Sequence, residues 1–219
     1  MSSKLSKWIV VPAAVLWFGS VALGQDTSSS GSSTQGSGTT TSTQKQPTIA
    51  GRKENQQDRI ANGVKSGQLT AGETANLESK EAAINGETRA DRAANGGKLT
   101  PAEKQQINRQ QNQVSKQIYQ DKHNANTAHY GNNAVGQRRE NQQDRIAQGI
   151  KSGQLTAGET AKLENQQKGI NQQVKADRAA NGGKLTQSEK KQINKEQNAA
   201  SKNIYNKKHN ANTQAGTKK

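Results

Sequence analysis

One segment of the chain occurs twice. Residues 54–127 align onto residues 140–213 without a gap, at a fixed offset of 86 residues, and 52 of the 74 paired positions are identical. A duplication of this length predicts two tandem units with the same fold. We place these units at 51–127 and 139–213, with a linker rich in Gly and Asn at 128–138 and a disordered tail at 214–219.

Each unit carries the signals of three helices. A threonine followed three residues later by a glutamate has the capping-box spacing that begins a helix, and such a pair occurs twice in each unit. An Asn-Gly pair, at 95–96 and again at 181–182, indicates a helix end, because glycine readily adopts the left-handed conformation found there. The sequence predicts an all-α chain with helices at 52–65, 70–95, 100–122, 138–151, 156–181 and 186–208. The capping pairs are Thr70 with Glu73, Thr100 with Glu103, Thr156 with Glu159 and Thr186 with Glu189.

The apolar residues of these helices form a narrow seam. In the third helix, Ile107, Val114 and Ile118 are spaced seven and four residues apart, which places them on one face. About eight aliphatic side chains per unit, each contributing about 1.5 to 3 kcal/mol when buried, barely oppose an ordering entropy of about 1 to 2 kcal/mol per residue. One unit is therefore expected to be marginally stable alone, and self-association is an open alternative. The least similar stretch, 79–89 against 165–175, is expected to be a mostly solvated helix face.

Residues 1–24 have the parts of a secretory signal peptide. Lys4 and Lys7 precede an apolar run that ends at small residues near Gly24, where cleavage is expected. The Ser/Thr/Gly-rich tract that follows has nothing to bury, so 25–50 is predicted to be a disordered linker. We expect a secreted or periplasmic protein without stable membrane insertion. Retention of the apolar run as an anchor is the alternative.

The mature chain is basic and poor in aromatic residues. Removing the two leader lysines from the net charge of +15 leaves +13, which predicts attraction to anionic polymers of the bacterial envelope or the extracellular space. The plainer interpretation of this charge is solubility, because the cations are interspersed with acids. Both tryptophans and the only phenylalanine lie in the leader, and the chain has no cysteine. Neither an aromatic core nor disulfides can therefore support the mature fold.

The turn between the second and third predicted helices raises the question of a metal site. An EF-hand loop has oxygen ligands at positions 1, 3 and 5, glycine at 6, an aliphatic residue at 8 and glutamate at 12. With one inserted residue, the turn has suitable residues at positions 1, 5 and 12, whereas Ala93 leaves position 3 without a ligand. We favour the interpretation as a capped turn without an ion, and calcium binding is the alternative. The candidate calcium ligands are Asp91, Asn95 and Glu103 in the first unit, and Asp177, Asn181 and Glu189 in the second.

The motif Gly-x-Leu-Thr-x-x-Glu, present twice in each unit, resembles the turns of a degenerate EF-hand pair from bacterial secreted proteins. The resemblance covers the two turns of a unit and their flanking helices. It implies EF-hand-like helical hairpins with calcium as the ligand, and no other cofactor is expected. It also implies that the position-8 leucines meet across a short two-stranded bridge, Leu69 with Leu99 and Leu155 with Leu185.

Both units end in a further shared motif. Tyr119 precedes His123 by four residues, and Tyr205 precedes His209 in the same way, so each pair lies on one helix face. Beside neighbouring lysines, such a pair is suited to contact a sugar or a phosphate group. The interpretation that we favour is that the tyrosine completes the apolar seam, beside Ile118 or Ile204. His129 has no counterpart in the second unit, which argues against a metal site at this residue.

The sequence contains no pattern typical of catalysis. It has no cysteine nucleophile, no glycine-rich phosphate loop and no metal-binding pair of histidines. Three tyrosines are also too few for a platform that stacks nucleic-acid bases. We therefore expect a non-enzymatic exported protein with a binding or scaffolding role and no specific nucleic-acid partner. The alternatives are a hydrophilin-like protectant against desiccation or osmotic stress, suggested by 21 glycines and a mean hydropathy of −1.11, and a weak calcium-binding protein.

Overall fold

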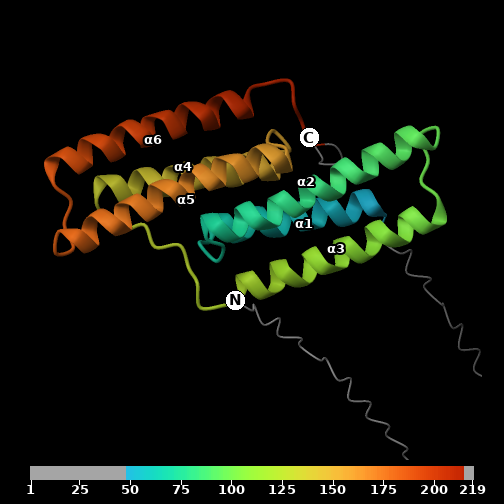
Figure 1. Ribbon diagram of the computed structural model, residues 1–219, viewed down its shortest axis with the longest axis horizontal. Helices are drawn as coiled ribbons and strands as arrows, with labels where there is room; N and C mark the ends of the chain where they lie inside the picture. Colours follow the sequence, from blue (N-terminus) through green and yellow to red (C-terminus); the bar gives the residue numbers. More distant parts are fainter. Residues whose placement is uncertain (1–47, 215–219) are drawn as a thin grey trace, which may run out of the picture. The chain divides into compact units, whose positions relative to one another are not determined.

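The computed structural model describes residues 48–214, which form an all-α fold of six helices (Figure 1). The predicted signal peptide, nearly all of the predicted linker at 25–50 and the last five residues lie outside the described residues. Each repeat contributes three helices. They are α1 (Ile49–Lys65), α2 (Ala71–Ala94) and α3 (Pro101–Lys122) in the first repeat, and α4 (Ala134–Lys151), α5 (Ala157–Ala180) and α6 (Gln187–Lys208) in the second.

All four predicted capping boxes form. At the start of α2, the Glu73 N–H donates to Thr70 Oγ1 (3.3 Å) and the Thr70 N–H donates to Glu73 Oε2 (2.9 Å). Each box satisfies two backbone N–H groups that have no partner inside the helix. For this reason α2, α3, α5 and α6 begin within one residue of the predicted positions, and their ends also lie within one residue of the predicted ones.

The first helix of each repeat begins earlier than predicted, at Ile49 and at Ala134. In α4, the Gly136 N–H donates to Asn133 Oδ1 (3.1 Å), and Thr48 caps α1 in the same way. Gly136 suggested a linker, but a Cβ atom at this position would lie 2.0 Å from the Tyr130 carbonyl oxygen. This glycine allows the preceding loop to lie against the helix and does not interrupt it.

Within each repeat, the third helix packs on both of the earlier helices. α3 contacts α1 and α2, and α6 contacts α4 and α5, whereas the first two helices of a repeat contact each other much less. The predicted apolar seam lines these contacts and is confirmed, because Ile107, Ile118, Ile193 and Ile204 are fully buried.

The two repeats pack on each other through copies of the same helices. Among the described residues, the most extensive contacts are α2 with α5 and α1 with α4, while α3 and α6 do not touch and lie on opposite sides (Figure 1). A Cβ atom at Gly72 would lie 3.5 Å from the Lys168 side chain, and one at Gly158 would lie 3.9 Å from Ala82. α2 and α5 therefore run antiparallel. Because Gly158 is the copy of Gly72 and Lys168 the copy of Ala82, a pseudo-twofold relation exchanges the repeats.

The main hydrophobic core is shared by the repeats. One continuous apolar cluster contains Ile60 and Leu77 from the first repeat and Ile146 and Leu163 from the second. A smaller cluster around Ile193 belongs to the second repeat alone. The few aliphatic residues of one repeat thus gain burial against those of the other, which offsets more of the ordering entropy than either repeat could alone.

The same core also buries polar side chains. Gln57 Nε2 donates to Glu78 Oε2 (3.1 Å), and the copies of these residues, Gln143 and Glu164, form the same hydrogen bond (2.9 Å). Both glutamates are fully buried, as is Glu81, whose two carboxylate oxygens have no hydrogen-bond partner among the described residues. The cost of burying these groups depends on their protonation, because a neutral carboxyl is far easier to bury than a charged one.

The leucine pairing implied by the EF-hand resemblance does not form. Leu69 lies in the turn before α2 and Leu99 in the turn after it, so the 24 residues of α2 separate the two turns. A helix of that length spans about 36 Å. α5 separates Leu155 from Leu185 in the same way, and no strand occurs in residues 48–214. In each repeat the two turns lie at opposite ends of one helix, whereas the expected pairing requires them to lie side by side.

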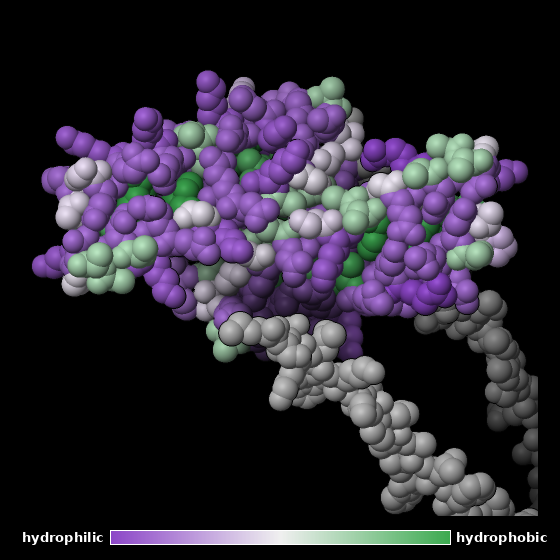
Figure 2. Space-filling model, in the orientation of Figure 1, coloured by the Kyte–Doolittle hydropathy of each residue, from purple (hydrophilic) through white to green (hydrophobic). Residues whose placement is uncertain are grey.

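The visible surface is strongly hydrophilic, with apolar residues confined to small separate areas (Figure 2). Tyr119 and Tyr205 are 60% and 56% exposed. The idea that these tyrosines complete the apolar seam is therefore wrong, since the seam continues through the adjacent residues Ile118 and Ile204. In the part of the chain that the structure covers, no helix combines the length and the apolar character required to cross a bilayer.

Candidate anion-binding cavities

Two cationic cavities lie where the repeats meet. The first, which we call the α2 cavity, has a volume of about 670 Å³ and lies at the first turn of α2. Its walls include four cationic side chains from the second repeat and no aspartate or glutamate. The cations are Arg139 from α4 and Lys168, Lys175 and Arg178 from α5.

Arg139 is the most unusual residue of the α2 cavity. Its side chain is 8% exposed, and its guanidinium forms no ion pair or hydrogen bond with any described residue. Its guanidinium lies over the face of the Tyr130 ring, whose centroid is 5.3 Å from the guanidinium carbon. Burial lowers the pKa of Arg139, and the positive charge of Arg178 lowers it further. The Nε atom of Arg139 is enclosed without a hydrogen-bond partner among the described residues, which is costly, and an anion in the cavity that accepts from this guanidinium would offset the cost.

The backbone of α2 adds hydrogen-bond donors to this wall. Ala71 and Gly72 occupy the first two positions of the helix and line the cavity, and their N–H groups have no acceptor among the described residues. These groups carry the partial positive charge of the helix N-terminus. A glycine at the second position leaves the backbone uncovered by a side chain. Unpaired N–H donors and Arg139 therefore meet around one space.

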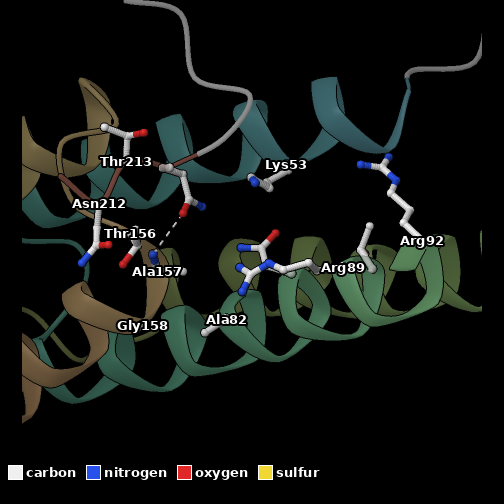
Figure 3. Close-up of a pocket in the computed structure, with 12 residues that line it drawn as sticks. Lys53, Ala82, Arg89, Arg92, Thr156, Ala157, Gly158, Asn212 and Thr213 are labelled. Atoms are coloured by element: carbon white, nitrogen blue, oxygen red, sulfur yellow. Dashed lines mark hydrogen bonds between the residues drawn. The ribbon is translucent and has the colours of Figure 1, made fainter. Parts of the chain in front are cut away.

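The pseudo-twofold relation generates a second cavity, the α5 cavity, of about 580 Å³ (Figure 3). Lys53 of α1 lies on one wall, and Arg89 and Arg92 come from α2, opposite the first residues of α5. Figure 3 shows Arg89 extending toward Ala157. Burial lowers the pKa of Lys53, Glu81 acts in the opposite direction, and Arg89 and Arg92 lower it further. No acidic side chain lines this cavity either.

The cations of the two cavities are copies of one another. Lys53 corresponds to Arg139, Arg89 to Lys175, and Arg92 to Arg178, each at the offset of 86 residues. Two of these three positions change their residue and keep their charge. Sequence reasoning missed this signal, because two of the positions lie in or beside the dissimilar stretch that was expected to be solvated and the third precedes the aligned segment.

The predicted calcium ligands lie together at the turns after α2 and α5. Asn95 Nδ2 donates to Glu103 Oε1 (2.8 Å) and to the Asp91 carbonyl oxygen (2.9 Å), while the Thr100 N–H donates to Glu103 Oε2 (2.8 Å). This last bond lowers the pKa of Glu103. The second copy has the same pattern in Asp177, Asn181 and Glu189.

Hydrogen bonds within the turn therefore engage both oxygens of Glu103 without an ion. Within residues 48–214, no three side chains of His, Cys, Asp or Glu are grouped so that they could hold a metal ion. Calcium binding by these residues stays a prediction.

The Tyr–His motifs lie on the surface near the ends of α3 and α6. The Tyr119 and His123 rings stack with centroids 4.2 Å apart, and Tyr205 and His209 stack at 4.1 Å. His129 lies in the wall of the α2 cavity. The motif's asparagines have a structural role, because Asn124 and Asn126 both donate to Glu73 Oε1 (2.8 and 3.1 Å) and hold the end of the repeat against the start of α2.

Comparison with known proteins gives no relative: no protein-family model, no curated protein and no solved structure matches the chain. The geometry of the cavities is therefore the basis for a functional proposal.

Proposed function

We propose that the mature protein is an exported, non-enzymatic binding protein that holds anionic groups of envelope or extracellular polymers in the α2 and α5 cavities. The observation that carries this proposal is Arg139, a largely buried side chain whose charge has no acidic partner among the described residues and which lines a cavity with three further cations. Such a site favours phosphate, sulfate or carboxylate groups, because these ions accept hydrogen bonds from both guanidinium and backbone N–H donors.

A polymer is favoured over an isolated small ion for two reasons. The mature net charge of +13 raises the local concentration of any polyanion around the whole chain. The two cavities also provide two attachment points on one protein, so one polymer that reaches both is held by avidity.

The proposal is tested by the binding of residues 25–219 to two polyanions, a polyphosphate and a carboxylate polysaccharide, over a range of salt concentrations. The cavity variant Lys175→Gln/Arg178→Gln should weaken binding at least tenfold. The matched control is Lys195→Gln/Lys202→Gln, which removes the same charge from exposed positions of α6 outside the walls of both cavities. Equal losses in both variants would show that only the net charge matters and would refute a role for the cavities.

The protectant alternative rests on the hydrophilic composition and predicts a different behaviour. Circular dichroism of the mature chain separates the two, because a protectant of this kind is a coil in dilute buffer, whereas a binding protein with built cavities melts cooperatively from a helical state.

A further inference from the structure

The two cavities differ at one position that touches the helix N-terminus. In the α5 cavity, the Ala157 N–H donates to Gln214 Oε1 (3.2 Å). The corresponding residue in the α2 cavity is Ala128, whose methyl group offers no acceptor. The N–H of Ala71, the copy of Ala157, consequently has no partner among the described residues.

The backbone at these two positions is held in the same way. The Gln214 N–H donates to the Gly153 carbonyl oxygen (2.8 Å), and the Ala128 N–H donates to the Gly67 carbonyl oxygen (2.9 Å). Both segments therefore dock equivalently on their repeats. At these two positions the cavities therefore differ only in the side chain, and Gln214 is 5% exposed, which places its amide inside the structure.

The cations differ in the same direction. Lys168 lines the α2 cavity, whereas its copy in the α5 cavity is Ala82. The α2 cavity thus has one more positive side chain and an open backbone donor. The α5 cavity has one fewer cation, and the Gln214 amide oxygen already accepts a hydrogen bond from its first backbone donor, the Ala157 N–H.

We propose that the two cavities are unequal: the α2 cavity is the principal oxyanion site, and the Gln214 side chain is an internal cap that competes with anions for the α5 cavity. This inference rests on the proposed function and specifies its ligand as a group with several acceptor oxygens, such as a phosphate. One oxygen accepts from the Ala71 and Gly72 N–H groups, while the others face Arg139 and the lysines. The amide oxygen of Gln214 occupies the place of that first oxygen in the α5 cavity.

The test is calorimetric titration of residues 25–219 with inorganic phosphate at low ionic strength. The natural sequence should bind one phosphate at least tenfold more tightly than a second. Gln214→Ala should strengthen the second site and leave the first unchanged. Ala128→Gln should weaken the first site by a similar factor, because it introduces the same cap in the other cavity.

Gln214→Glu gives an independent measurement at the cap. Its carboxylate should close the α5 cavity more completely than the amide, so the second site should be lost while the first remains. Circular dichroism spectra of all variants verify that they are folded. If Ala128→Gln does not fold, the two Gln214 variants still decide the question.

The possible outcomes separate this inference from the proposed function. Two equal sites in the natural sequence, or a second site unchanged by both Gln214 variants, would overturn the inequality and leave the cavities as anion sites. Absence of phosphate and polyanion binding in every variant would overturn the proposed function and the inequality together.

Discussion

Glu78 and Glu164 are copies of one another, and the structure buries both completely in the core shared by the repeats. Each accepts one hydrogen bond from a glutamine and has a second oxygen without a partner among the described residues. Burial raises the pKa of Glu78 to about 8, and the neighbouring carboxyls Glu81 and Glu164 raise it as well. Burial likewise raises the pKa of Glu164 to about 8 and that of Glu81 to about 7, the latter opposed by Lys53.

These pKa values predict that the fold is most stable at mildly acidic pH. The folded chain binds protons that the unfolded chain, with glutamate pKa values near 4.5, releases. The free energy of unfolding therefore falls as the pH rises from about 5 to 9, by several kcal/mol on the scale of about 1.4 kcal/mol per pKa unit. Thermal melts across this range measure the effect. A melting temperature that is constant or rises with pH would contradict the burial of these carboxyls.

Replacing the paired glutamates should remove much of this dependence. In Glu78→Gln/Glu164→Gln, a neutral amide takes the place of the protonated carboxyl, so the variant should be more stable than the natural sequence at pH 9 and similar at pH 5. The chain already contains one such replacement, since the copy of Glu81 is Gln167. Asp58→Asn, at an exposed position of α1, is the control and should leave the pH profile unchanged.

Two glycines in helices should respond in opposite ways to alanine. A Cβ atom at Gly63 would lie 2.7 Å from the Leu69 side chain, so Gly63→Ala should destabilise the fold by about 1 to 3 kcal/mol through overpacking. Nothing lies within 4 Å of a Cβ atom at Gly86, so Gly86→Ala should stabilise α2 by about 0.5 to 1 kcal/mol. Denaturant unfolding of both variants measures this difference. Equal effects would mean that the turn after α1 does not pack as described.

The asparagines that follow α3 should contribute to stability through Glu73. Asn124→Ala/Asn126→Ala removes two hydrogen bonds to one carboxylate oxygen and should lower the free energy of unfolding by about 1 to 2 kcal/mol. Asn210→Ala/Asn212→Ala, the equivalent change at Glu159, should have a similar effect. The matched control is Asn132→Ala, an exposed residue before α4. No loss in either double variant would indicate that these contacts are absent in solution.

Calcium should have little effect on the melt, because both oxygens of Glu103 already accept hydrogen bonds within the turn. Replacing Glu103 and Glu189 by alanine should lower the melting temperature equally with and without millimolar calcium, since the loss is that of a helix cap. A calcium-dependent rise in melting temperature that disappears in this variant would instead support the metal site.

Local structure was largely predictable from the sequence, and the arrangement of the helices was not. The Thr–Glu pairs placed four helices because capping is decided by residues three positions apart. Gly136 misled the prediction of α4, since the role of a glycine depends on what approaches it, here the Tyr130 carbonyl.

The cavities could not be predicted for a related reason. Arg139 resembles an ordinary solvated cation in the sequence, and its burial, like the place of the exposed Lys175 in the same cavity wall, depends on how α4 and α5 pack against the first repeat. The dissimilarity of 165–175 to 79–89 indicated a solvated face. It partly reflects the contact between α2 and α5, where Glu81 is buried.

The packing of α1 on α4 and of α2 on α5 means that each repeat packs against a diverged copy of itself. A fragment carrying only residues 48–128 would present the surface that its own copy fits, so two such fragments are expected to assemble as a homodimer whose melting temperature rises with protein concentration. In the intact chain, the segment between α3 and α4 keeps the two halves at a high effective concentration, and the fold then becomes independent of dilution.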